Sequence, residues 1–158
     1  MLTSEHLRAF IQEHGIQGEI LHLKDSVSTV NQAAEAVGAQ ADQIVKSLLF
    51  NVADQQVLVI ACGPQRISSK SIANHYGVTS KQVKLASPPI VLATTGYEVG
   101  AVPPFGHHQQ VPTLVDRRVL EQETVYAGGG GHRVLLRFSP GEILRVTAAE
   151  PIDLHGQA

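Results

Sequence analysis

One lysine interrupts an apolar segment and is the clearest candidate for chemistry in this chain. Lys46 stands within Ile44–Phe50, a run whose β-branched and apolar residues predict a β-strand. Because side chains alternate along a strand, Lys46 shares one face with Ile44, Leu48 and Phe50. A lysine on such a face either extends its ammonium into solvent or holds a ligand's carbonyl, hydroxyl or phosphate at the edge of a pocket. Both interpretations remain open at this point.

A second candidate is the segment Thr94–His107, which contains three glycines and two prolines among its 14 residues. Glycine and proline both disfavour a regular helix or a central strand. The segment also carries bulky apolar side chains, which a solvated linker disfavours: Tyr97, Val99, Val102 and Phe105. This pattern predicts a shaped loop whose main chain lines a binding site. An ordinary packed surface loop is the alternative.

Other reactive residue types give weaker patterns. The four glycines Gly128–Gly131, followed by His132, allow close approach of the main chain, but the spacing of a phosphate-binding P-loop is absent. A flexible hairpin turn is the alternative. The eight histidines have no Cys or acidic residue at a familiar ligand spacing, so no metal site is predicted. Cys62 ends an apolar strand and is expected to be a packed side chain rather than a nucleophile.

Length and composition limit the class of protein. The chain has 158 residues, 43% of them hydrophobic and 16% charged, which fits one folded domain and excludes a disordered chain. It contains no apolar run long enough to cross a membrane, and its single cysteine excludes an internal disulfide. We therefore expect a soluble cytoplasmic protein with one domain over residues 1–158 and no membrane partner.

The charge distribution carries more information than the net charge of −2. No acidic residue occurs between Asp54 and Glu98, whereas the same interval holds four basic residues and thus a charge of +4: Arg66, Lys70, Lys81 and Lys84. A patch of this kind can contact a few phosphates. A solvated face without a partner is the alternative.

Apolar periodicity and breaker residues predict alternating helices and strands. Five helices are expected. The first lies around Leu7–Ile11 and ends at Gly15, the second begins at a Thr29/Gln32 capping box and runs to Val37 and Gly38, and the third covers Ser68–Tyr76. The fourth begins at Ser87-Pro88, and the fifth begins at the capped start Ser139-Pro140-Gly141-Glu142. The expected strands are Glu19–Leu23, a hairpin of Ile44–Val52 and Val57–Ala61 around a four-residue turn, Val111–Val115, Thr124–Ala127 and Val134–Phe138. This order favours an α+β domain with a mixed sheet over a doubly wound parallel one.

The order of these motifs resembles one known family. Lys46 in Ile44–Leu48, then Thr95-Gly96-Tyr97, then Gly100-x3-Pro104 with Phe105-Gly106-His107, then a glycine-rich turn, are similar to the YbaK/ProX family. Its members are free-standing aminoacyl-tRNA deacylases related to the editing domain inserted in bacterial prolyl-tRNA synthetases. The resemblance covers residues from about 25 to 155. It implies a mixed, barrel-like β-sheet with surrounding helices, and hydrolysis of the ester between a mischarged amino acid and the terminal adenosine of a tRNA.

The resemblance also implies roles for individual residues. Lys46 matches the family's essential lysine, which positions the substrate near the scissile ester. The Gly100–Pro104 loop would hold the terminal adenosine, and a water oriented by main-chain groups would attack the ester. The full set of substrate-binding residues expected in this way is Thr95, Gly96, Tyr97, Gly100, Pro103, Pro104, Gly106, His107, Gly129 and Gly130.

The resemblance implies no cofactor. It implies the acceptor end of a mischarged tRNA as partner, and it allows an aminoacyl-tRNA synthetase as a second one. Some relatives carry an acidic residue in the strand after the glycine turn, where this chain reads Val134-Leu135-Leu136. This difference weakens the transfer of an acidic catalytic partner and of a specific amino acid to this chain, and hydrolysis by a side-chain base or by an oriented water alone both stay open. Two alternatives stay open: a binding module for the acceptor end without turnover, and a hydrolase or binder of a small non-tRNA metabolite.

Overall fold

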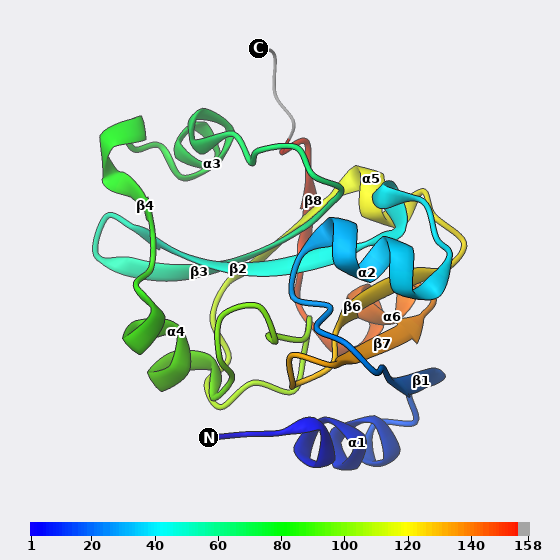
Figure 1. Cartoon of the computed structure of the whole chain (residues 1–158). Helices are drawn as coiled ribbons and strands as arrows, with labels where there is room; N and C mark the ends of the chain where they lie inside the picture. Colours follow the sequence, from blue (N-terminus) through cyan, green and yellow to red (C-terminus); the bar gives the residue numbers. More distant parts are fainter. Residues whose placement is uncertain (155–158) are drawn as a thin grey trace.

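Two β-sheets, with helices packed around them, form the computed structural model of this chain (Figure 1). The structure describes residues 1–154, so positions 155–158 of the predicted domain lie outside the described residues. The larger sheet has the strand order β4 (Val83–Leu85), β2 (Val45–Val52), β3 (Gln55–Cys62), β5 (Thr113–Asp116) and β8 (Glu150–Ile152). The smaller sheet has the order β1 (Gly18–His22), β7 (Val134–Phe138) and β6 (Val125–Gly128).

Strand directions make the larger sheet mixed. Strands β4, β2 and β3 pair antiparallel, whereas β3 pairs parallel with β5 and β5 with β8. The smaller sheet is antiparallel throughout. The two sheets meet at a bridge between Ile44 and Tyr126, and the strands described do not close into a barrel. The predicted α+β class with a mixed sheet is confirmed.

Six α-helices cover the described part of the chain: α1 (Ser4–Glu13), α2 (Val30–Val37), α3 (Ser69–Tyr76), α4 (Pro88–Thr95), α5 (Arg117–Leu120) and α6 (Gly141–Val146). Two 3-10 turns, Ala41–Gln43 and Ser80–Gln82, precede β2 and β4. The predicted capping box of α2 is present, because Thr29 Oγ1 accepts from Gln32 N (3.1 Å) and Gln32 Oε1 accepts from Thr29 N (3.2 Å). The left-handed Gly38 ends this helix as predicted.

The predicted start of the last helix is wrong. Helix α6 begins at Gly141, and no side chain caps it. The carboxylate of Glu142, expected to complete a capping box with Ser139, instead accepts from Gln17 N (2.9 Å) and from the Arg145 guanidinium. The chain then continues into β8, a three-residue strand too short to give a sequence pattern.

The predicted hairpin is present with a tighter turn. Val52 pairs with Gln55, so two residues, Ala53 and Asp54, form the turn in place of the predicted four. Ala53 has a φ of 53°, a conformation uncommon for a residue other than glycine. The polar residues Gln55 and Gln56 therefore belong to β3, because ladder hydrogen bonds to β2 outweigh their low strand propensity.

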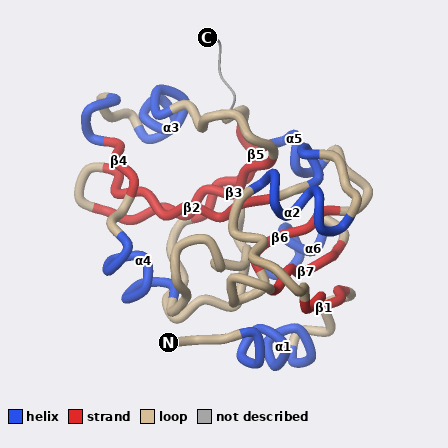
Figure 2. Tube along the Cα trace, viewed as in Figure 1, coloured by secondary structure: helices blue, strands red, loops and turns tan. Residues whose placement is uncertain are grey.

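The two faces of β2 lie in different apolar cores. Val45 and Leu49 pack in the largest core with Tyr97 and Phe105, whereas Phe50 packs against α3 on the opposite face. Figure 1 shows this arrangement, with α3 on one side of the β2–β3 hairpin and α4 on the other. Figure 2 shows that the segment between α4 and β5 is loop throughout.

The glycine turn after β6 packs directly on that loop. Gly130 N donates to Ala101 O (2.9 Å). A Cβ on Gly128 would overlap the main-chain carbonyl of Val102, and one on Gly129 would lie 2.8 Å from the carbonyl oxygen of Val134. These glycines are thus required by close main-chain packing.

We predict that Gly128→Ala lowers the free energy of unfolding by about 2 kcal/mol or more, because the main chain of Val102 cannot yield as a flexible side chain would. Urea unfolding measures this. Gly141→Ala is the matched control, since a Cβ there meets no heavy atom within 4 Å. Equal stability of the two variants would contradict the packing argument.

Candidate functional site

Lys46 lies at an open edge of the larger sheet. Strand β4 pairs with β2 only at residues 50–52, and no described strand pairs with β2 at residues 45–49 on that side. Leu49 O accepts from Ala86 N (2.9 Å) at the last contact with the β4 segment. Main-chain groups of alternate residues point to the same edge, so the N–H and C=O of Ser47 also point to the open side.

A cavity of about 280 Å³ occupies this open edge. Its walls come from the loop before α2, from β2, from the loop at Val99–Val102 and from Gly128. Lys46 is half-buried in its wall. In the described part of the chain no carboxylate forms an ion pair with the Lys46 ammonium. The charge is therefore available to a ligand in this cavity.

A smaller cavity of about 120 Å³ adjoins the larger one, and their linings share residues of β2 and of the Val99–Val102 loop. It is lined almost entirely by apolar side chains from β2, β4 and α4, including Leu49, Leu85 and Val91. Ser47 contributes to both cavities, and its Oγ is buried without a hydrogen-bond partner among residues 1–154. Within the described part of the chain, Ser47 is the only polar side chain that lines the smaller cavity.

Gly100 lines both cavities. Its φ of +89° favours glycine, and a Cβ there would lie 3.3 Å from Ser28 Cβ. Ala101 N donates to Glu98 O (3.0 Å), which closes a tight turn around this residue. The loop thus presents main chain rather than side chains at this point, as its composition predicts.

A polar cluster lies beside Gly100 at the mouth of the larger cavity. Ser28 Oγ lies 2.8 Å from His132 Nδ1, and His132 Nε2 lies 3.8 Å from Glu98 Oε1. When the Ser28 hydroxyl donates a hydrogen bond to Nδ1, the proton of the neutral ring is on Nε2 and points toward Glu98. The sequence pattern does not predict Ser28 or Glu98, since 104 residues separate Ser28 from His132. The one available signal is His132, directly after the glycine turn.

The structure brings only part of the predicted site together. Lys46 and Gly100 line the same cavity. Gly129 and Gly130 lie behind it, where they pack against Val134 and Ser4, while their neighbour Gly128 reaches the cavity wall. A substrate contact for Gly129 and Gly130 stays a prediction.

Three further predicted residues lie in the buried segment that leads from the end of α4 to the Val99–Val102 loop. Thr95 Oγ1 donates to Val91 O (2.8 Å), Gly96 ends α4 in the left-handed region, and Tyr97 is fully buried. The Tyr97 hydroxyl donates to Gly106 O (3.3 Å), and burial raises the Tyr97 pKa to about 12. These residues do not line the Lys46 cavity, so their contact with a substrate also stays a prediction.

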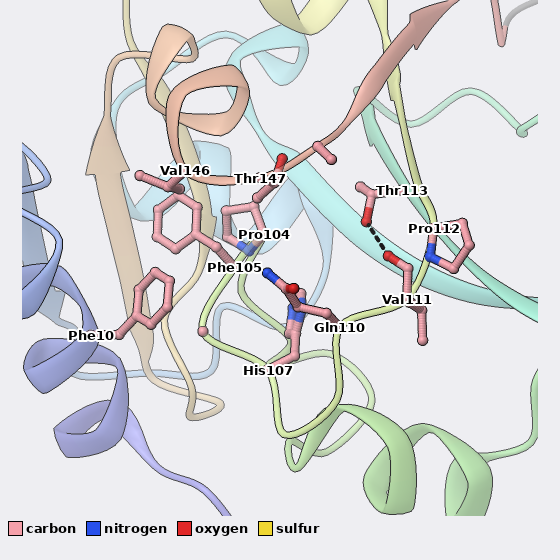
Figure 3. Close-up of a pocket in the computed structure, with 12 residues that line it drawn as sticks. Phe10, Pro104, Phe105, His107, Gln110, Val111, Pro112, Thr113, Val146 and Thr147 are labelled. Carbon is pink, nitrogen blue, oxygen red and sulfur yellow. Dashed lines mark hydrogen bonds between the residues drawn. The ribbon is translucent and has the colours of Figure 1, made fainter.

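Pro104, Gly106 and His107 line a different cavity, of about 300 Å³ (Figure 3). Phe10 of α1 and Phe105 form its aromatic wall, with ring centroids 5.7 Å apart. His107 Nε2 lies 2.6 Å from the carbonyl oxygen of the buried Pro103. Burial lowers the pKa of His107, and the hydrogen bond to Pro103 partly opposes this shift. His107 is therefore neutral near pH 7.

Two other reactive groups give no site. Cys62 is buried, and its pKa rises to about 11, first through desolvation and then through the nearby Asp116 charge. Its thiol is thus protonated at neutral pH, in line with a packed side chain. Within residues 1–154, no three His, Cys, Asp or Glu side chains gather in a way that would hold a metal ion.

None of the described helices is long and apolar enough to cross a bilayer.

Comparison with known proteins identifies the family. The sequence profile described as "Aminoacyl-tRNA editing domain" matches residues 24–146. This range includes Lys46, the loop before α2, the Val99–Val102 loop and the glycine turn. The chain belongs to this family. The resemblance inferred from the order of the motifs is confirmed.

Relatives of this editing domain agree with the assignment. The chain is 29% identical to the Escherichia coli multifunctional Ser/Thr-tRNA deacylase ProXp-y, over 99% of this chain and 95% of that protein. It is 31% identical to part of the proline–tRNA ligase of Shouchella clausii, over 87% of this chain and 24% of the ligase. A crystal structure assigned as a trans-editing enzyme for prolyl-tRNA synthetase superposes with a TM-score of 0.87 at 32% identity, covering 96% of this chain and 95% of the other.

We predict that His107 makes the fold less stable in acid. Its folded-state pKa is lowered, so the unfolded chain binds the proton more readily once the pH falls below the usual histidine value of 6.5. Stability is therefore full above that value and declines on acidification. Urea unfolding at about pH 7.5 and about pH 5.5 measures the decline, which should be smaller in His107→Gln. The exposed neighbour variant His108→Gln is the control and should behave as wild type.

Proposed function

We propose that this protein is a trans-editing aminoacyl-tRNA deacylase that hydrolyses the ester of a misacylated tRNA in the cytoplasm, as a single domain over residues 1–158. The observation that carries the proposal is the Lys46 ammonium, which has no carboxylate partner in residues 1–154 and lines a cavity closed by the main chain of the Gly100 loop. Membership of the editing domain family supports this use of the cavity.

In the proposed reaction, water attacks the carbonyl carbon of the aminoacyl ester. The new bond joins the water oxygen to that carbon, the bond to the ribose oxygen breaks, and the proton released from water ends on that oxygen. Lys46 orients the substrate and offsets negative charge near the ester. The outward-pointing N–H of Ser47 is a main-chain donor available to the developing oxyanion. The loop from Gly100 to Pro104, including Pro103, would hold the terminal adenosine.

The smaller cavity suits the side chain of the attached amino acid. Its small volume, about 120 Å³, and its apolar walls favour a small, uncharged side chain. Ser47 supplies one hydroxyl there. Because the relative ProXp-y is named a Ser/Thr-tRNA deacylase, seryl- and threonyl-tRNA are the first substrates to test. A synthetase that charges such a tRNA is a second proposed partner.

Two alternative functions give different results in the same assays. A binding module for the acceptor end binds an RNA minihelix and hydrolyses nothing. A hydrolase of small metabolites cleaves simple esters or nucleotides with little dependence on the acceptor stem. The cavity and its lysine are compatible with both, and the family favours the deacylase.

We predict that Lys46→Ala lowers kcat/KM on the best aminoacyl-tRNA by about 100-fold or more, because it removes the charge that positions and stabilises the reacting end. Deacylation of a panel of radiolabelled aminoacyl-tRNAs measures this. Lys70→Ala, at an exposed position on α3, is the matched control and should keep wild-type activity. A wild-type protein that deacylates none of the panel would refute the enzyme assignment.

A further inference from the structure

We propose that a groove containing Lys81 and Lys84 binds the phosphates of the single-stranded 3′ end of the tRNA while the ester occupies the Lys46 cavity. This inference rests on the proposed function and adds the surface through which the RNA reaches the site. The residues that line this groove lie outside the three cavities described above.

The groove lies beside the turn of the β2–β3 hairpin. It encloses about 600 Å³ and is lined by Asn51, Ala53, Asp54, Lys81, Gln82 and Lys84. Ala53 N donates to Gln82 O (2.8 Å), which fixes the 3-10 turn against the hairpin. Both lysines are exposed, and neither forms an ion pair with a carboxylate in the described residues. Their positive charges are therefore free to meet phosphates.

The groove and the Lys46 cavity lie along the same edge of β2. Lys84 pairs with Asn51, five residues beyond Lys46 on the same strand. At about 3.3 Å per residue, the groove begins about 17 Å from Lys46 along β2, a span that a few nucleotides of single strand can cover. Cross-strand partners share a face, so Lys84 lies on the same face as Asn51 and, by alternation, Ser47, whereas the side chain of Lys46 lies on the other face. The RNA end would therefore pass around the unpaired edge of β2, where the Lys46 cavity is lined by residues of both faces, Ser47 and Lys46.

An exposed apolar side chain lies between the two sites. Leu85 is 60% exposed and lines the smaller cavity next to the lysines. An unpaired base can pack on such an apolar surface. Two exposed lysines, an apolar surface and the proposed ester site thus follow one another, as the phosphates, bases and aminoacyl ester do at the 3′ end of a charged tRNA.

The basic interval predicted from the sequence is divided between the two faces of the sheet. Lys81 and Lys84 flank the groove, whereas Lys70 lies on α3, which packs on the opposite face of β2. Asp54 is the one carboxylate in the groove lining and reduces its positive potential. These positions supply variants of equal charge change inside and outside the proposed path.

The test compares kcat/KM for deacylation of aminoacyl-tRNA by wild type, Lys81→Glu, Lys84→Glu and the matched control Lys70→Glu over a range of salt concentrations. We predict that each groove variant loses roughly three- to tenfold, mainly through KM, and that its salt slope shrinks by about 0.7 per lost phosphate contact. Asp54→Asn should act in the opposite direction and lower KM. Lys70→Glu should match wild type.

A minimal substrate distinguishes a loss of phosphate binding in the groove from a loss of catalysis in the Lys46 cavity. An aminoacyl ester of adenosine alone carries no phosphate that could reach Lys84, so wild type and the three lysine variants should cleave it at equal rates. Equal losses of Lys84→Glu and Lys70→Glu on tRNA would overturn the proposal. If wild type cleaves no aminoacyl ester, the proposed function fails, and fluorescence anisotropy with a labelled single-stranded CCA-ended oligonucleotide still tests the groove. Unchanged affinity in Lys84→Glu would then refute it.

Discussion

The short length of β4 is the constraint on which the site depends. Strand β4 ends at Leu85, and after the contact between Ala86 and Leu49 the chain reaches Pro88 and Pro89. Proline has no N–H to donate and favours the start of a helix, so the chain leaves the sheet and forms α4. The remaining edge of β2 therefore stays unpaired beside Lys46. A longer β4 would fill this edge with backbone hydrogen bonds and leave no room for a ligand.

Close packing of main chain on main chain holds the opposite wall of the cavity. The loop at Val99–Val102 rests on the glycine turn after β6, at positions where no Cβ fits. Below it, Thr95 and Tyr97 satisfy loop and helix carbonyls from within the core. A loop held in this way needs little rearrangement to present its backbone to a substrate, which is what a reaction driven by oriented donors requires.

Sequence reasoning is reliable here where a local rule decides the structure. The capping box of α2 and the β2–β3 hairpin follow from residue types at short spacing. The shared location of Lys46 and Gly100 does not, because the two lie far apart in the sequence; the family resemblance predicts it. Ser28 and Glu98 could not be predicted, because tertiary packing alone brings them to His132. The location of Pro104 and His107 in a cavity away from Lys46 could not be predicted either. The composition of a loop indicates a binding surface, but it does not indicate which residues of the loop line which cavity.

In the proposed reaction, the reacting end of the substrate and the side chain it carries occupy two adjoining cavities that share the Val99–Val102 loop. Residues of β4 and α4 shape the smaller cavity, while Lys46 and the loop before α2 belong to the larger one. Substitutions such as those at Leu85 or Val91 can therefore change which amino acid fits without altering the surroundings of the lysine. Evolution can thus diversify the substrates of this fold while its chemistry stays the same, and an engineer can redirect it by the same route.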